Sequence, residues 1–96
     1  MKVVWSRRAT RHLVALRAYI GQDSEQNAAL VASRILKAVD LLQTQPGMGR
    51  PGRVPGTREL VVPGTPYLIP YRVRRERLEL MAVFHGRRRW PAKGTF

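Results

Sequence analysis

Apolar residues in the first half of the chain recur three or four positions apart, which is the spacing of amphipathic helices. A first helix is predicted to begin after Ser6, whose side chain is a favourable N-cap, and to end at Gly21. A second is predicted to begin after Asp23, with Gln26 three residues later in a capping-box position, and to end before residues 46–47, a Pro-Gly pair. The predicted buried stripes are Ala9, Leu13, Leu16 and Ile20 in the first helix, and Ala28, Ala32, Ile35, Val39 and Leu42 in the second.

Strands are predicted where β-branched or alternating apolar residues occur, in residues 2–5, 58–62, 67–73 and 78–85. Pro70 cannot donate a backbone hydrogen bond, so a bulge or an unpaired edge is expected beside it. Residues 46–57 contain four glycines and three prolines, and no regular structure is predicted there. The faces predicted to pack on the helices carry Tyr67, Ile69, Tyr71 and Val73 of the third strand and Leu78, Leu80, Ala82 and Phe84 of the fourth. The opposite side of the sheet is predicted to carry Arg72, Glu79, Met81, Val83 and His85.

The resulting order, β-α-α-β-β-β, predicts an α+β fold. The short connection between the helices favours an antiparallel hairpin, and this hairpin is expected to pack on one face of a mainly antiparallel, twisted sheet. Because 96 residues provide for one hydrophobic core only, residues 1–96 are predicted to form a single domain.

The net charge of the chain limits the kinds of partner it is expected to bind. The chain has 18 basic and 6 acidic residues, a formal net charge of +12, and only Lys2, Lys37 and Lys93 are lysine. A surface of this kind attracts nucleic acid, a ribosome or an acidic protein, and arginine favours planar, bidentate contacts with carboxylate or phosphate. Charge alone does not choose among those partners.

The cysteines, histidines and apolar segments of the sequence further limit the class of protein. Cysteine is absent, and His12 and His85 lie far apart in the sequence, so neither a disulfide nor a metal site is predicted, and no cofactor is expected. Neither a signal peptide nor a membrane-spanning run is recognised. We therefore expect a cytoplasmic protein without membrane contact.

Several strings, in this order, resemble the RelE/ParE family of bacterial toxins, and the likeness extends over essentially the whole chain. They are Trp5-Ser6-x-x-Ala9, Tyr19-Ile20, Gly49-Arg50-Pro51-Gly52, Gly56-Thr57-Arg58-Glu59-Leu60, Pro66-Tyr67-x-Ile69-x-Tyr71-Arg72-Val73 and Val83-Phe84-His85-Gly86-x-Arg88. The resemblance implies the toxin of a type II toxin–antitoxin pair, held inactive in a hetero-oligomer by a cognate acidic antitoxin. A disordered partner that folds on binding can cover a large surface and still be removed by proteolysis.

The family contains two activities, inhibition of DNA gyrase by ParE-type members and ribosome-dependent cleavage of mRNA by RelE-type members. Metal-independent RNA cleavage needs a base, an acid and cations around the phosphate. Here Glu59 or His85 could be the base, His85 the acid, and Arg58, Arg72 or Arg88 the cation. Structural alternatives are a hydrogen-bonded His85 at a strand end and a cross-strand ion pair of Arg72 with Glu79.

The sequence departs from the endonuclease pattern at three places, and the ParE-type reading, which needs no catalytic residues, is favoured. A basic residue is missing at Leu68 or Ile69, a lysine-rich helix or loop has no counterpart, and Gly86-Arg87-Arg88-Arg89-Trp90 replaces a closing aromatic or histidine pair. A small basic nucleic-acid-binding module is the third alternative, although no helix-turn-helix, zinc or RNA-binding motif is recognised.

Two contact surfaces are predicted, because arginine and tryptophan are common anchor residues of protein interfaces. The residues predicted to bind the target, gyrase or else the ribosome with its mRNA, are Arg72, His85, Arg87, Arg88, Arg89 and Trp90. The residues predicted to bind the antitoxin are Arg8, Arg11, Arg50, Arg53, Arg58, Tyr67 and Arg72.

Overall fold

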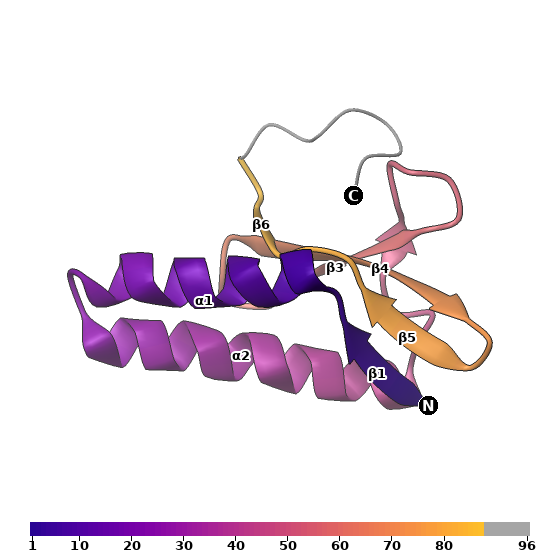
Figure 1. Ribbon diagram of the computed structural model, residues 1–96, viewed down its shortest axis with the longest axis horizontal. Helices are drawn as coiled ribbons and strands as arrows, with labels where there is room; N and C mark the ends of the chain where they lie inside the picture. The colour runs from indigo at the N-terminus through magenta and orange to yellow at the C-terminus, as the bar shows by residue number, and fades with distance from the viewer. Residues whose placement is uncertain (88–96) are drawn as a thin grey trace.

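A computed structural model describes residues 1–87, and this part of the chain contains two helices and six strands (Figure 1). The elements are β1 (Lys2–Trp5), α1 (Arg7–Gly21), α2 (Glu25–Thr44), β2 (Arg50–Pro51), β3 (Arg58–Val61), β4 (Tyr67–Arg74), β5 (Arg77–Leu80) and β6 (Phe84–His85). The helices lie side by side as an antiparallel pair, with β3 and β4 running behind α1 in this view. The predicted α+β class and helical hairpin are confirmed. Neither helix in residues 1–87 is long and apolar enough to cross a membrane.

Each helix begins at a serine. The Ser6 hydroxyl accepts a hydrogen bond from the backbone N–H of Ala9 at 3.0 Å, as predicted. The cap of α2 is Ser24, which accepts from the N–H of Asn27 at 3.1 Å, so the prediction of Asp23 was wrong. The N–H groups of Asp23 and Ser24 both donate to the carbonyl of Ile20, so the turn that ends α1 extends through Ser24 and α2 begins one residue later than predicted.

The sheet is mainly antiparallel, as predicted. Its strand order is β1-β5-β4-β3-β2, and β6 pairs with β4 beyond the end of β5. The exception to the antiparallel arrangement is β1, which pairs with β5 in parallel. The prediction that residues 46–57 hold no regular structure was wrong at two positions, because β2 pairs with the start of β3.

A β-bulge interrupts the segment that was predicted as one continuous strand, residues 78–85. Leu80 pairs with Tyr71, and Phe84 pairs with Leu68. The two partners on β4 are separated by two residues, 69–70, whereas Leu80 and Phe84 are separated by three, 81–83. The bulge lies beside Pro70, where one was expected: the Pro70 carbonyl accepts from the N–H of Met81 at 2.9 Å, but Pro70 has no N–H to complete the pair.

The extra residue reverses the alternation of side chains after the bulge. His85 pairs with Tyr67, and their rings meet edge to face with centroids 5.6 Å apart, so His85 lies on the side that faces the helices. The predicted face of His85 was therefore wrong. Phe84 pairs with Leu68, and its ring lies 5.2 Å from the ring of His12 on α1, so it contacts a helix as predicted. Val83 was also misplaced, because it is buried in the core, and its N–H donates to Nδ1 of His12 on α1 at 3.1 Å.

One hydrophobic cluster joins the helices to the sheet. The predicted stripe residues of both helices contribute to it, apart from Ala28 and Ala32 of α2. The predicted odd-numbered face of β4 contributes as well, except for Val73, which is exposed. The buried members are Ala9, Leu16, Ile35, Ala38, Val39, Leu42, Leu60, Val62, Tyr67, Ile69, Tyr71, Leu78, Leu80 and Val83. The burial of these side chains is what positions the loops and sheet edges described next.

Candidate functional site

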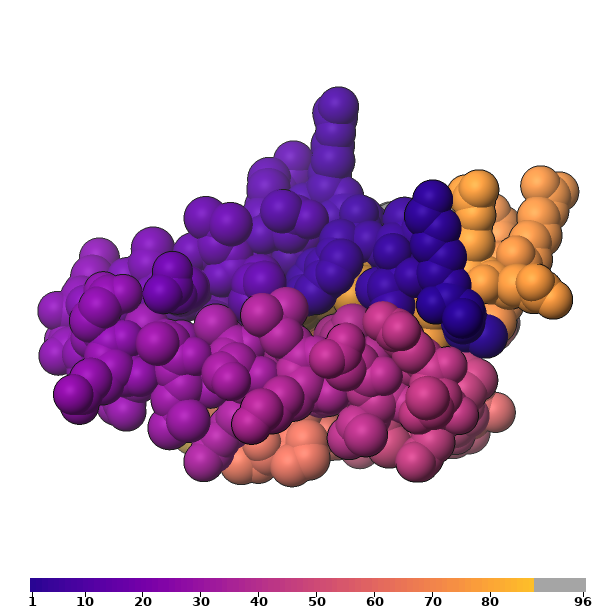
Figure 2. Space-filling view, turned by 90° about the horizontal axis from the view of Figure 1, so that it is seen from below, coloured from indigo at the N-terminus to yellow at the C-terminus, as the bar shows by residue number. Residues whose placement is uncertain are grey.

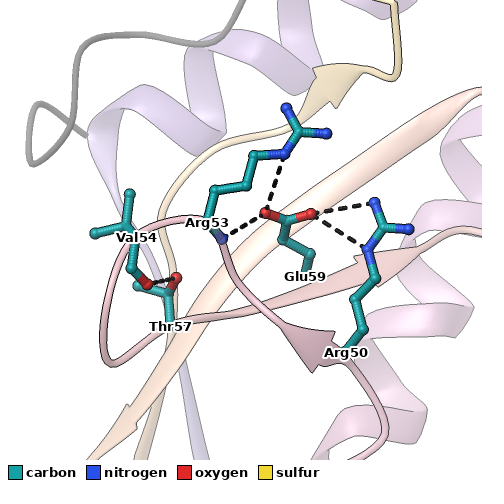
Figure 3. A network of polar contacts seen from close by, with 5 residues as sticks. All are labelled: Arg50, Arg53, Val54, Thr57 and Glu59. Atoms are coloured by element: carbon teal, nitrogen blue, oxygen red, sulfur yellow. Dashed lines mark hydrogen bonds and ion pairs between the residues drawn. The ribbon is translucent and has the colours of Figure 1, made fainter.

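Glu59, predicted as a catalytic base, instead anchors the loop of residues 46–57 (Figure 3). Its side chain is only 2% exposed. One carboxylate oxygen accepts from Arg50, with Nη2 at 3.2 Å, and the other accepts from the backbone N–H of Arg53 at 3.0 Å, while the Nε of Arg53 lies 3.7 Å away. A buried carboxylate needs such partners to offset the loss of water. Glu59 therefore fixes the path of the chain through Arg50 and Arg53.

Tyr71 holds the beginning of the same loop. Its hydroxyl donates to the carbonyl of Pro46 at 2.7 Å and accepts from the N–H of Gly49 at 2.9 Å. Burial raises the pKa of the Tyr71 hydroxyl, against the lowering effects of its bond with Gly49 and of the nearby Arg58 charge, so the donated hydrogen is retained at neutral pH. Arg58 adds a hydrogen bond to the carbonyl of Gly49 at 2.8 Å. Thus two residues of the predicted sites, Arg58 and Glu59, contact the loop.

The sheet separates the residues predicted for RNA cleavage. Glu59 pairs with Pro70 and so lies on the same side of the sheet as Arg72, whereas His85 pairs with Tyr67 on the helix-facing side. Nδ1 of His85 accepts a hydrogen bond from the backbone N–H of Arg87 at 3.1 Å. The structure therefore does not bring Glu59 and His85 together as an acid–base pair. Arg88 lies outside the described residues.

A basic groove lies between the start of α1 and β5, on the side of the sheet that carries Arg72. It has a volume of about 430 Å³, and arginines from α1 and β4 line it beside Glu79. The lining residues, which we call the arginine groove, are Val4, Ser6, Arg7, Arg8, Arg11, Arg72, Glu79, Leu80 and Met81. A second depression of about 440 Å³, formed with residues 54–57, shares Arg72 and Met81 with it. Three residues predicted to bind the antitoxin, Arg8, Arg11 and Arg72, are thus brought together.

Arg72 and Glu79 form the cross-strand ion pair that was the structural alternative for Arg72. The residues are direct partners on β4 and β5, and the Nε of Arg72 donates to a carboxylate oxygen of Glu79. This hydrogen bond is the main reason that the pKa of Glu79 is lowered, with attraction to Arg74 and Arg77 adding to it and burial opposing it. The pair leaves the guanidinium partly exposed at the edge of the arginine groove.

A groove that sequence reasoning missed lies between α2 and β3. Its volume is about 750 Å³, and its walls include exposed apolar side chains of α2, the loop and β3. In the view onto α2, atoms from the segment after β3 emerge alongside that helix (Figure 2). The lining residues, which we call the apolar groove, are Arg34, Lys37, Ala38, Leu41, Met48, Gly49, Arg50, Glu59, Leu60, Val61, Pro63 and Gly64. One sequence feature could have indicated this groove: Leu41 is an apolar residue of α2 that lies outside the predicted buried stripe.

The other predicted contact residues are distributed unevenly. Arg50, Arg53 and Arg58 surround the loop, as described above, and Arg87 is exposed next to His85. Tyr67 is 8% exposed and belongs to the core, so it offers little surface to a partner. Arg88, Arg89 and Trp90 lie outside the described residues. Within residues 1–87, no three His, Cys, Asp or Glu side chains come together as metal ligands would.

Comparisons with known proteins agree on one family. Residues 3–90 match the family described as ParE toxin of type II toxin-antitoxin system, parDE. The chain is 46% identical over 90 residues to Y4kP of Sinorhizobium fredii (strain NBRC 101917 / NGR234), covering 94% of this chain and 93% of that protein. It is 37% identical over 87 residues to Toxin RelE2 of Caulobacter vibrioides (strain ATCC 19089 / CIP 103742 / CB 15), covering 91% and 97%. A solved structure, described as a chromosomal ParDE TA system from P. aeruginosa, matches with a TM-score of 0.79 and 28% identity over 88% of this chain and 95% of that chain.

Proposed function

Since this chain belongs to the ParE toxin family of type II toxin–antitoxin systems, we propose that it inhibits DNA gyrase by protein–protein binding in the cytoplasm. The observation that carries the proposal is the separation of the candidate proton carriers. Glu59 is buried by its ion pairs, and His85 lies on the other side of the sheet. A binding inhibitor needs neither residue as an acid or a base, whereas RNA cleavage without metal needs both functions.

The surface proposed to bind gyrase includes the exposed cations near the end of the described chain. Arg87 is exposed, His85 is half-buried beside it, and Arg72 is partly exposed on the opposite side of the sheet. Arg88, Arg89 and Trp90 follow directly in the sequence and add the residue types that most often anchor protein interfaces.

We further propose that a cognate acidic antitoxin neutralises the toxin in a hetero-oligomer. The net charge of +12 supports an acidic partner, because opposite charge speeds association and screens the self-repulsion of a basic protein. The residues proposed for this contact are the arginines of the predicted set, Arg8, Arg11, Arg50, Arg53, Arg58 and Arg72, whereas Tyr67 is too buried to take part.

The decisive experiment compares two assays on the same purified protein. We expect inhibition of supercoiling by purified bacterial gyrase, and intact message when the protein is added to translating ribosomes. The variant Arg87→Glu should weaken gyrase inhibition, and Glu76→Gln in the β4–β5 turn is its control. Unimpaired supercoiling together with message cleavage at the ribosomal A site, abolished by His85→Ala, would refute the gyrase proposal.

Ribosome-dependent mRNA cleavage is the second candidate, because a relative with 37% identity carries the name Toxin RelE2. The feature that could serve it is the arginine groove, whose guanidinium groups suit contact with phosphate. The same pair of assays distinguishes the two candidates.

A further inference from the structure

The end of the sheet formed by β1, β4 and β5 carries cations directly opposite one another. Arg77 of β5 pairs with Arg74 of β4 on one side and with Lys2 of β1 on the other. Directly opposed residues point to the same side of a sheet, and like charges in that position repel each other. Two residues further along both strands, by contrast, Arg72 is opposite Glu79 and binds its carboxylate. The row of three cations therefore opposes the pairing of the strands instead of stabilising it.

The turn between β4 and β5 adds a fourth cation in an unfavourable backbone conformation. Its two residues, Arg75 and Glu76, have φ angles of 51° and 61°. A two-residue hairpin turn of this kind prefers asparagine or glycine, because most other residues are rarely stable at positive φ. Arg75 is exposed and takes part in no ion pair within residues 1–87. An exposed arginine that does not favour folding indicates a contact outside the chain.

These four exposed residues, Lys2, Arg74, Arg75 and Arg77, form what we call the cationic end. Figure 2 shows the orange β4–β5 turn and the indigo start of the chain side by side at one end of the molecule. A cavity of about 230 Å³ at the turn is lined by Arg74, Arg75, Arg77 and Glu79. Two carboxylates lie in this region: Glu76 does not line the cavity, and Glu79 is bound by Arg72. The cationic end therefore keeps an excess of positive charge that attracts an anionic partner.

The cationic end suits phosphate groups better than the surface of an acidic protein. None of the residues that line its cavity is apolar, whereas apolar and aromatic side chains form the centre of a protein–protein interface. Guanidinium groups form paired hydrogen bonds with phosphate oxygens, and three of the four cations are arginine. The chemistry of this surface is therefore that of a contact with a nucleic acid backbone.

Duplex DNA fits this surface better than a single strand. Proteins bind unpaired bases largely by stacking them on aromatic side chains. Trp5 of β1 packs against the core, and the exposed Tyr19 lies near the end of α1, at the opposite end of the molecule from the β4–β5 turn (Figure 1). The major groove of a duplex, by contrast, admits a two-stranded β-ribbon between its phosphates. The β4–β5 hairpin, with arginines at its tip, is such a ribbon.

We propose that the cationic end binds the phosphates of duplex DNA without regard to base sequence. The β4–β5 turn lies against a groove of the duplex, and the four cations contact the phosphates on its borders. This proposal goes beyond the proposed function, because binding to DNA requires neither gyrase nor an antitoxin. None of the four residues belongs to the surfaces proposed above for those two partners. A toxin held on DNA would also be concentrated where gyrase works.

The test measures the affinity of the full-length toxin, purified without antitoxin, for a short fluorescent DNA duplex of mixed sequence at increasing salt. Arg75→Glu and Arg77→Glu reverse charges at the cationic end. Arg17→Glu, at an exposed position near the end of α1, changes the net charge equally and is the matched control. We expect Kd to increase by at least about tenfold for the first two variants and by less than about threefold for the control. The dependence of log Kd on log salt should also become shallower by about one for each lost phosphate contact.

Arg75→Gly separates DNA binding from folding. Glycine adopts positive φ without strain, so thermal melts should show a variant at least as stable as the wild type. The loss of one phosphate contact should nevertheless raise its Kd for the duplex by about threefold or more. A stable Arg75→Gly protein with wild-type affinity would overturn the role of the turn, even if the charge reversals fail to fold.

The remaining outcomes identify the partner. Absence of duplex binding at low salt, or an equal loss for Arg17→Glu, overturns the proposal. Tighter binding of a single-stranded RNA of the same length would make RNA the partner, and equal binding of poly-glutamate would show that phosphate is not required. Gyrase inhibition is measured separately. A toxin that inhibits gyrase without binding DNA refutes this proposal alone, whereas DNA binding without gyrase inhibition refutes only the proposed function.

Discussion

The helix–sheet core and the loop of residues 46–57 are both built onto β3, but different contacts stabilise them. Leu60 of β3 points into the apolar cluster, where burial of hydrocarbon is the main stabilising force. Its neighbour Glu59 is bound by Arg50 and Arg53, so the loop is held by ion pairs and hydrogen bonds. Apolar burial is non-directional and tolerates several shapes, whereas the polar contacts fix one path of the backbone. The core should therefore determine global stability, and the loop contacts should determine local order.

The largest loss of stability is expected from a substitution in the core. Leu42 of α2 is fully buried, so Leu42→Ala leaves a cavity and should lower the free energy of unfolding by about 2–5 kcal/mol. Leu36→Ala, on the same helix at a position 49% exposed, should cost less than about 1 kcal/mol. Urea denaturation of both variants measures the difference. Equal losses would mean that the cluster does not dominate stability.

A smaller effect is expected where the loop approaches Tyr71. A Cβ added at Gly49 would lie 2.7 Å from the Tyr71 hydroxyl oxygen, so Gly49→Ala should displace the loop and cost about 1–3 kcal/mol. Gly47→Ala meets nothing within 4 Å and should be close to neutral. Tyrosine fluorescence and thermal melts report the two results. A stable, unperturbed Gly49→Ala protein would contradict the close contact.

The carboxylate of Glu59 should contribute still less to global stability. Glu59→Gln keeps the shape but removes both ion pairs, and Arg50 and Arg53 can then turn to solvent because they are half exposed. The expected loss is about 1–2 kcal/mol, with faster amide exchange confined to residues 50–53. Glu76→Gln, in the exposed β4–β5 turn, is the matched control. Exchange that increases equally in α2 would show that the loop and the core open as one unit.

The smallest effect concerns Glu79, and it depends on pH. Because the pKa of Glu79 is lowered in the folded chain, its contribution is present above the pKa of the unfolded chain and is lost as pH falls through the lower, folded value. Glu79→Gln should therefore cost less than about 1 kcal/mol at neutral pH and nothing in strongly acidic solution. Urea denaturation at both pH values checks this. The same loss at both would indicate packing, not charge, as the cause.

The parts of the fold that depend on local sequence patterns could be predicted from the sequence. Helices, strands and the core side of β4 follow from apolar periodicity, which is a local property of the chain. Ser6 as a cap and the irregularity beside Pro70 were equally accessible, since each depends on one residue type. The cap of α2 was misassigned because Asp23 and Ser24 are both good caps, and only the turn that ends α1 decides between them.

The candidate site was less predictable, because its contacts join distant residues. The sequence near Glu59 does not predict that Arg50 and Arg53 will surround its carboxylate, because Arg50 reaches it only when β2 pairs with β3. Likewise, a single extra residue in the bulge moved His85 to the other side of the sheet, and strict alternation cannot anticipate such an insertion. The apolar groove arises only when α2 and β3 are placed side by side.

The parallel pairing of β1 with β5 has a consequence for synthesis of the protein. Lys2 pairs with Arg77, so the first strand made is without its partner until the hairpin of β4 and β5 has been translated. Pairings of such long sequence separation form slowly. A nascent toxin would therefore lack a complete sheet until late in translation, since its N-terminal strand pairs with a segment near the other end of the chain.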